Sequence, residues 1–407
     1  MTAPALAERI AGVVRRAAGG KEGPIPLHEP CFAGSEWNFV RECLDSGWVS
    51  SVGSFVDRFE RALEDFTGAP HAVAVVNGTA ALHLCLLLAG VEPGDEVLIP
   101  ALSFVATANA VAYCGAVPHF VDSEISTLGV DPVKLARYLE EIALPSPGGC
   151  RNRMSGRPIR ALVPMHTFGH PADLQGLSEL CGRFGLALVE DAAESLGSRY
   201  RGAHTGTFGL LGAVSFNGNK IVTTGGGGAI LTGDEALARR ARHLSTTAKL
   251  PHRWAFRHDA VGFNYRLPNL NAALGVAQME ELPAFLSAKR RLAAYYREEF
   301  ATLAGASFFA APEGCQSNYW LNALLLAPEL AGLRDRLLDE LNDRGIMARP
   351  AWEPLHRLPP YLDAPRMELS TAEGLADRII NIPSSPALGL ALERSTPVNH
   401  GEQGEQP

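Results

Sequence analysis

One lysine stands directly before an unusually flexible stretch of the chain. In the segment SFNGNKIVTTGGGGA, residues 215–229, Lys220 precedes a run of four glycines. A phosphate loop of the nucleotide-binding type has the opposite order, with its glycines before the lysine and a Ser or Thr after it. Because Lys220 is followed by Ile221, that loop is excluded. Two interpretations remain, an ordinary surface lysine or a lysine whose amine reacts with a carbonyl group.

A second group of residues could bind an anion. The apolar run AVAVV, residues 72–76, leads into Asn77, Gly78 and Thr79 and then directly into a helical pattern. Backbone N–H groups at a helix start, with a hydroxyl and a glycine that allows close approach, form an anion site. Taken alone, the segment is explained equally well by a threonine that caps the helix.

Two carboxylates follow another apolar run. The segment LALVEDAAESLG places Glu190 and Asp191 at the end of a strand, where ligands bind in open parallel sheets. A carboxylate there could act as a general base, bind a metal or pair with a cationic ring nitrogen. No His or Cys lies at ligand spacing from these residues, and His166 and His170 lack the glutamate of a zinc helix. We therefore expect no metal.

These residues together match the needs of one cofactor, pyridoxal 5′-phosphate. It requires an anchored phosphate, a stacked ring, an anion at its ring nitrogen and a lysine bonded to its aldehyde. The cradle at Gly78 and Thr79, the aromatic Phe104, the carboxylate of Asp191 and the amine of Lys220 would meet these needs in turn.

The elements that must position these residues alternate along the chain. Between about residues 72 and 214, short apolar runs alternate with helical patterns, for example EVLIP and then FVATANAVAYCG. Such alternation predicts parallel strands joined by helical crossovers, and hence a mostly parallel sheet covered on both faces. The connection 144–160 is rich in Pro, Gly and Arg, and we expect an exposed loop there.

The pattern changes after residue 268. A helical stretch covers residues 269–303, in which Pro283 predicts a break or kink, and more widely separated strands follow. We expect a large domain over residues 1–280 with an N-terminal helix at 1–20, a small α+β domain over 281–395, and a disordered tail at 396–407.

The bulk composition excludes several classes of protein. The 36 Lys and Arg against 44 Asp and Glu give a net charge of -8, and no basic stripe suggests a nucleic acid partner. Seven cysteines without a CxxC pair argue against a disulfide framework and a zinc ribbon, and favour the cytoplasm. The sequence contains no run of about 18 apolar residues, so we expect no membrane-spanning helix.

The motifs, in this order, resemble the DegT/DnrJ/StrS family of sugar aminotransferases. The similarity extends through NGTAALHL, PALSFVATANA, VEDAAESLGS, SFNGNKIVTTGGGGA, FNYRLPNLNAALG and SNYWLNALLL. It implies the aspartate-aminotransferase fold, pyridoxal phosphate fold type I, and a homodimer with shared active sites. The chain looks most like the branch that aminates C4 of UDP-linked 4-keto-6-deoxy-N-acetylhexosamines, as in legionaminic-acid or bacillosamine-type pathways.

The resemblance implies a role for each motif residue. Lys220 would bond to the cofactor's aldehyde and move the reacting proton, Asp191 would pair with the ring nitrogen, and Phe104 would stack on the ring. The other residues expected at the cofactor are Gly78, Thr79, Ala80 and Ser215 at the phosphate, Asn264 at the partner chain's phosphate, and Glu194 near the ring. Glu194 departs from the more usual Gln or His, and the four glycines replace a more usual Gly-Glu-Gly-Gly.

The implied reaction moves an amino group from an amino acid, with L-glutamate as the expected donor, to the keto sugar. The product would be a 4-amino sugar for glycan or secondary-metabolite biosynthesis. Candidates for the nucleotide-sugar site are Trp48, Ser50, His166, Arg349, Trp352, His356 and Tyr361.

Several alternatives stay open or are disfavoured. A dTDP- or GDP-linked keto sugar is an alternative substrate within the same family. A sugar dehydratase of this family would carry His in place of Lys220. A non-catalytic regulator that binds pyridoxal phosphate would need a recognition domain, and the sequence shows neither a helix-turn-helix pattern nor a basic extension.

Overall fold

A nine-stranded sheet forms the centre of the molecule in the computed structural model, which describes residues 2–395. Seven strands follow the order β1-β11-β10-β7-β6-β2-β3. Their bounds are β1 (His71–Val75), β2 (Glu96–Pro100), β3 (Val117–Val121), β6 (Pro158–Leu162), β7 (Ala187–Asp191), β10 (Leu211–Ser215) and β11 (Gly228–Thr232). Strands β10, β7, β6, β2 and β3 run parallel, whereas β11 is antiparallel to both of its neighbours. The expected α/β architecture is confirmed.

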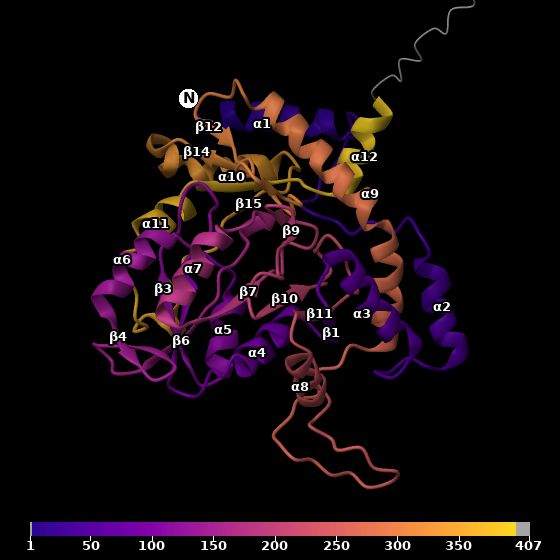
Figure 1. The fold of residues 1–407 in the computed structure, drawn as a ribbon. Helices are drawn as coiled ribbons and strands as arrows, with labels where there is room; N and C mark the ends of the chain where they lie inside the picture. Colours follow the sequence, from indigo (N-terminus) through magenta and orange to yellow (C-terminus); the bar gives the residue numbers. More distant parts are fainter. Residues whose placement is uncertain (1, 396–407) are drawn as a thin grey trace, which may run out of the picture.

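Helices cover both faces of this sheet (Figure 1). Val73 and Val75 belong to the apolar cluster on one face and Ala72 and Ala74 to that on the other, because successive residues of a strand point to opposite sides. One face is covered by α4 (Gly78–Leu88), α5 (Val105–Tyr113) and α8 (Glu235–Ser245), and the other by α3 (Ser54–Thr67), α6 (Pro132–Ile142), α7 (Leu174–Phe184) and α9 (Asn269–Glu299). Helix α2 (Glu36–Ser46) packs against α9.

A second, antiparallel sheet has the order β12-β14-β16-β15. Its strands are β12 (Ala306–Phe308), β14 (Asn322–Leu326), β15 (Arg349–Pro350) and β16 (Ile379–Ile382), and its helices are α1 (Ala3–Ala17), α10 (Arg334–Asp343) and α12 (Pro386–Ser395). The remaining elements include α11 (Ser370–Ala376) and a small sheet of β8 (Arg199–Tyr200), β9 (Ala203–His204) and β13 (Cys315–Gln316).

The N-terminal helix expected from the sequence is present as α1, but it packs against the C-terminal elements (Figure 1). Its buried Leu6 and Ile10 share an apolar cluster with Leu324 and Leu341. Its assignment to the large domain is therefore not supported. The expected boundary at residue 280 falls inside α9, and the division into two domains stays a proposal.

Two local expectations need correction. Helix α9 is continuous for 31 residues through Pro283, so the predicted break is absent, because the buried Leu282 and Phe285 hold the helix in the core at the cost of one backbone hydrogen bond. The ribbon of α9 bends near its middle (Figure 1), as the alternative of a kink predicts. The connection 144–160 is not an irregular loop. It contains a hairpin of β4 (Ala143–Ser146) and β5 (Gly149–Asn152), turned by Gly148 at φ 76°.

Three further expectations can be compared with the structure. The tail at 396–407 lies outside the described residues. All seven cysteines are free thiols. Over residues 2–395, none of the helices combines the length and the apolar character that crossing a membrane requires.

Candidate active site

A cavity of about 350 Å³ opens beyond the carboxyl ends of β7 and β10. These strands end at Asp191 and Ser215, and α4 and α5 begin beside them, so distant motifs meet at one edge of the sheet. Of the residues predicted from the sequence, the cavity brings together Gly78, Thr79, Phe104, Asp191, Glu194, Ser215, Lys220 and Trp352.

The first turn of α4 forms one wall. Asn77 is the N-cap, since its side-chain oxygen accepts the N–H of Ala80 at 2.8 Å, while the N–H groups of Gly78 and Thr79 have no acceptor within the helix. A Cβ on Gly78 would lie 2.8 Å from the Cβ of Ser215, so only glycine lets the helix start approach the end of β10. These amides and the Ser215 hydroxyl can hold an anionic phosphate.

Ala80 does not belong to this cradle, contrary to the expectation. It is buried, and its N–H is already bound to Asn77. Asn77 takes the capping role that the sequence suggested for Thr79, which leaves the Thr79 amide for a ligand.

Asp191 presents a carboxylate to the cavity. Its Oδ2 accepts a hydrogen bond from the hydroxyl of Thr107 at 2.7 Å, and its Oδ1 accepts the N–H of Ala193 at 3.2 Å. Burial raises the pKa of Asp191, and these hydrogen bonds offset that effect only in part. A buried carboxylate in this condition is stabilised as an anion when a cation lies beside it.

Lys220 lies across the cavity in the irregular segment between β10 and β11. Its Nζ is 3.3 Å from Oε1 of Glu194, whose Oε2 accepts the N–H of Phe168 at 2.9 Å. Burial raises the pKa of Glu194 to about 7, although the charge of Lys220 acts in the opposite direction. Glu194 can therefore exchange a proton near neutral pH, next to the amine of Lys220.

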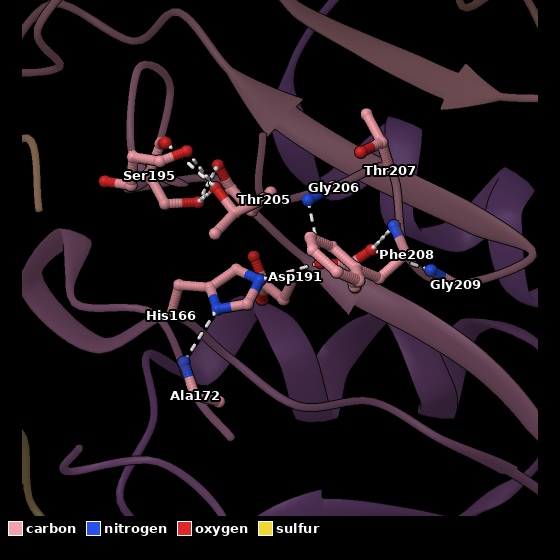
Figure 2. A network of polar contacts seen from close by, with 12 residues as sticks. His166, Ala172, Asp191, Ser195, Thr205, Gly206, Thr207, Phe208 and Gly209 are labelled. Carbon is pink, nitrogen blue, oxygen red and sulfur yellow. Dashed lines mark hydrogen bonds and ion pairs between the residues drawn. The ribbon is translucent and has the colours of Figure 1, made fainter. Parts of the chain in front are cut away.

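His166 is not brought into the cavity, although the sequence suggested a substrate role. It is fully buried, its Nε2 lies 3.0 Å from Oε2 of Glu190, and its Nδ1 accepts the N–H of Ala172. The N–H groups of Gly206, Phe208 and Gly209, which are labelled in Figure 2, donate to the same Glu190 carboxylate. The residue belongs to a closed structural network.

The other candidates for the nucleotide-sugar site lie apart from this cavity. His356 is buried and bonds to Glu373, and the Tyr361 hydroxyl donates to Asn109. Arg349 on β15 is exposed, as are Ser50 and Asn264. Their expected roles stay predictions, and in this chain alone none of them lines the cavity around Lys220.

Trp48 lines a larger cavity of about 630 Å³, together with Arg242 and Arg266. This cavity contains neither Lys220 nor Asp191. Because a reactive amine, a carboxylate and an anion cradle meet only in the smaller one among the described residues, we take the smaller cavity as the active site despite its size.

Two important residues were missed in the sequence. Thr107 binds Asp191, and Trp320 places its ring centroid 3.8 Å from Nζ of Lys220. Trp320 lies within the motif SNYWLNALLL, but an aromatic side chain next to an apolar run suggests only core packing. Thr107 lies on α5, three residues after Phe104.

The cavity fits pyridoxal phosphate on its own observations. Among the described residues no cation forms a hydrogen bond to the buried carboxylate of Asp191, the amides of Gly78 and Thr79 can accept a phosphate, and the amine of Lys220 lies in the same space. In the described part of the chain, no three His, Cys, Asp or Glu side chains are grouped as a metal site.

Comparisons with known proteins agree with this chemistry. Residues 30–394 match the model of the DegT/DnrJ/EryC1/StrS aminotransferase family. The chain is 37% identical to GDP-perosamine synthase of Caulobacter vibrioides over 89% of this chain and 94% of that protein. It is 32% identical to dTDP-4-dehydro-2,3,6-trideoxy-D-glucose 4-aminotransferase of Saccharopolyspora spinosa, over 91% and 94% of the two chains.

A solved structure shares the fold. The aminotransferase TlmJ from Streptoalloteichus hindustanus superimposes with a TM-score of 0.81 at 30% identity, over 92% of this chain and all of that one. The chain thus belongs to the DegT/DnrJ/EryC1/StrS aminotransferase family and is a pyridoxal-phosphate-dependent sugar aminotransferase.

Proposed function

We propose that the chain is a cytoplasmic enzyme that transfers the amino group of L-glutamate to C4 of a nucleotide-linked 4-keto-6-deoxyhexose. The observation that carries the proposal is the single cavity in which Lys220, Asp191 and the amides of Gly78 and Thr79 converge. When bound there, pyridoxal phosphate supplies an aldehyde that takes up amino groups and a ring that withdraws electrons.

The chain's own residues divide the remaining work. The amides of Gly78 and Thr79 bind the phosphate, and Asp191, oriented by Thr107, stabilises positive charge at the ring nitrogen. The amine of Lys220 moves the proton at the reacting carbon, since it is the basic side chain in the cavity. Phe104, half exposed at the cavity edge, covers the ring and excludes water.

The nucleotide is proposed from the relatives. One of the two relatives is named for a GDP-linked sugar and the other for a dTDP-linked sugar. We propose a GDP-linked substrate first, because the relative with the higher identity carries that name. The UDP-linked N-acetylhexosamine expected from the sequence is the second candidate, supported by the glycine run after Lys220.

A substrate panel tests this proposal. Purified enzyme with pyridoxal phosphate and L-glutamate is offered GDP-, UDP- and dTDP-linked 4-keto-6-deoxysugars, and the amino sugar is detected by mass spectrometry. We expect kcat/KM to be highest for the GDP-linked sugar. A preference for the UDP-linked sugar would replace the first candidate by the second, and no amination of any sugar would contradict the C4 transfer itself.

We also propose a homodimer in which Asn264 reaches the partner's phosphate site. The segment after α8 projects from the body of the chain (Figure 1), and its Trp254 and Phe256 are 75% and 79% exposed. Large exposed apolar side chains mark interaction surfaces. Inactive Lys220→Ala and Asn264→Ala proteins should regain activity when their subunits are exchanged, because one intact site then forms in a mixed dimer. Unchanged inactivity of the mixture would contradict a shared site.

A further inference from the structure

The reactive lysine lies on a part of the chain with little regular structure of its own. Residues 216–227, between β10 and β11, contain neither helix nor strand, and Asn219 is exposed. A lysine on such a segment has many accessible conformations, so placing its amine requires contacts from elsewhere in the molecule.

Trp320 supplies two of these contacts from the C-terminal part of the chain. Its indole N–H donates to the carbonyl of Asn219 at 2.7 Å, which fixes the backbone directly before Lys220. The face of the same ring lies 3.8 Å from Nζ of Lys220, at a distance typical of a cation above an aromatic ring. One side chain thus restrains both ends of the lysine.

The position of Trp320 is itself fixed. Its backbone N–H donates to Oδ1 of Asn318 at 2.8 Å, and its carbonyl accepts from Nζ of Lys289 at 3.2 Å. Lys289 is completely buried and also donates to the carbonyl of Ser384. Lys289 therefore connects α9 to the segment before β14 and to the segment after β16. Trp320 is only 5% exposed, so its ring has little freedom to turn away from Lys220.

We propose that Trp320 is a positioning residue for Lys220. Its ring holds the unbound Lys220 side chain and its indole N–H anchors Asn219, so that the amine meets the cofactor in a productive orientation. The inference rests on the proposed role of Lys220 as the lysine that bonds to pyridoxal phosphate. Trp352 offers a matched comparison, because it lines the same cavity but contacts Phe104 and Phe168 instead.

The test is the rate at which cofactor-free protein attaches pyridoxal phosphate, followed by visible absorbance over a range of cofactor concentrations. The saturating rate should fall about threefold in Trp320→Phe, which keeps a ring but loses the N–H, and about tenfold or more in Trp320→Leu. The half-saturating concentration should stay unchanged, because the phosphate is held by Gly78, Thr79 and Ser215. In Trp352→Phe the saturating rate should fall less than in Trp320→Phe, because the Trp352 ring contacts Phe104 and Phe168.

A saturating rate at the wild-type value in Trp320→Leu would overturn the inference. Equal slowing in the Trp320 and Trp352 variants would also overturn it, since a general loosening of the cavity would then explain both. Thermal melting checks that each variant folds, and Trp320→Phe alone decides if Trp320→Leu does not fold. If the wild type itself attaches no cofactor at Lys220, the proposed function is wrong. If the wild type and all variants attach the cofactor equally fast, only the role of Trp320 is wrong.

Discussion

Glu190 and Asp191 are neighbours at the end of one strand, yet their surroundings are opposite. Glu190 accepts hydrogen bonds from three backbone N–H groups and contacts the buried His166. Burial alone would raise the pKa of Glu190, but the His166 hydrogen bond and the backbone N–H groups bring it below its ordinary value. Burial raises the pKa of Asp191, for which Thr107 and Ala193 compensate only in part.

The difference separates a carboxylate that the chain itself satisfies from one that we propose binds a ligand. The chain itself satisfies Glu190, which fixes the turn around Gly206 to Gly209 beside the strand. Asp191 is also buried, but among the described residues no cationic side chain lies within hydrogen-bond distance of its carboxylate. A bound cation at that place completes the site, as the protonated ring nitrogen of pyridoxal phosphate would.

The largest effect on kcat is expected for Lys220, which lines the same cavity as Asp191. Lys220→Ala should lower kcat by about 10⁴-fold or more, because both the covalent attachment and the proton transfer depend on the amine. Amination of the keto sugar with L-glutamate is the measurement. Its control is Lys21→Ala, which removes an exposed amine outside the cavity and should retain normal turnover. Turnover that survives in Lys220→Ala would contradict the assignment.

Asp191→Asn should reduce kcat by about a thousandfold, since a neutral amide cannot stabilise positive charge at the ring nitrogen. Its thermal stability without cofactor should equal or exceed that of the wild type, because a carboxyl group with a raised pKa destabilises the folded chain once it ionises. Steady-state kinetics and thermal melting of one preparation measure both quantities. A strong loss of stability with normal kinetics would reverse the roles of the two carboxylates.

Glu190→Gln should show the complementary result. The substitution weakens three hydrogen bonds to backbone N–H groups, of which one is buried and two are partly buried, and leaves an amide N–H₂ facing those donors, at a cost of about 2–4 kcal/mol in the free energy of unfolding. Denaturant unfolding measures this loss. In the folded fraction, attachment of pyridoxal phosphate should remain, and a stable Glu190→Gln protein that cannot attach the cofactor would contradict a structural role.

Glu194 gives a smaller effect that depends on pH. Since its pKa is raised by burial from an ordinary value of 4.5 to about 7, the folded state holds this proton more tightly than the unfolded state. The stability from this group is full below pH 4.5 and is lost as the pH rises toward about 7, with a slope of at most about 1.4 kcal/mol per pH unit. Glu194→Gln should therefore flatten the decline of the melting temperature of the cofactor-free protein between about pH 5 and pH 8. An identical decline in both proteins would show that Glu194 does not titrate there.

The sequence can predict the parts of the site that local patterns determine. Strand ends and glycine positions are local properties, so the sequence alone places Asp191, Ser215 and Gly78 at the sheet edge. The contact between Trp320 and Lys220 joins residues 100 positions apart through packing of the C-terminal part, which no local pattern reveals. The sequence leaves His166 open between a structural and a substrate role for the same reason, because its orientation depends on the buried contact with Glu190.

The fold also has features that local patterns predict and features that depend on distant packing. Alternating apolar and helical patterns predict the parallel sheet, since each crossover is local. The packing of α1 on the C-terminal sheet could not be predicted, because its apolar stripe indicates that a face is buried and not which partner covers it. Pro283 does not end α9, because tertiary packing outweighs the loss of one hydrogen bond.

The most direct test of the proposed chemistry is to identify the lysine that bonds to the cofactor. The wild-type protein is mixed with pyridoxal phosphate, reduced with borohydride, digested and analysed by peptide mass spectrometry. We predict one stoichiometric modification on Lys220, and its loss when excess L-glutamate is added before reduction. An unmodified Lys220, or a stoichiometric modification on another lysine such as Lys249, would contradict the central role of Lys220.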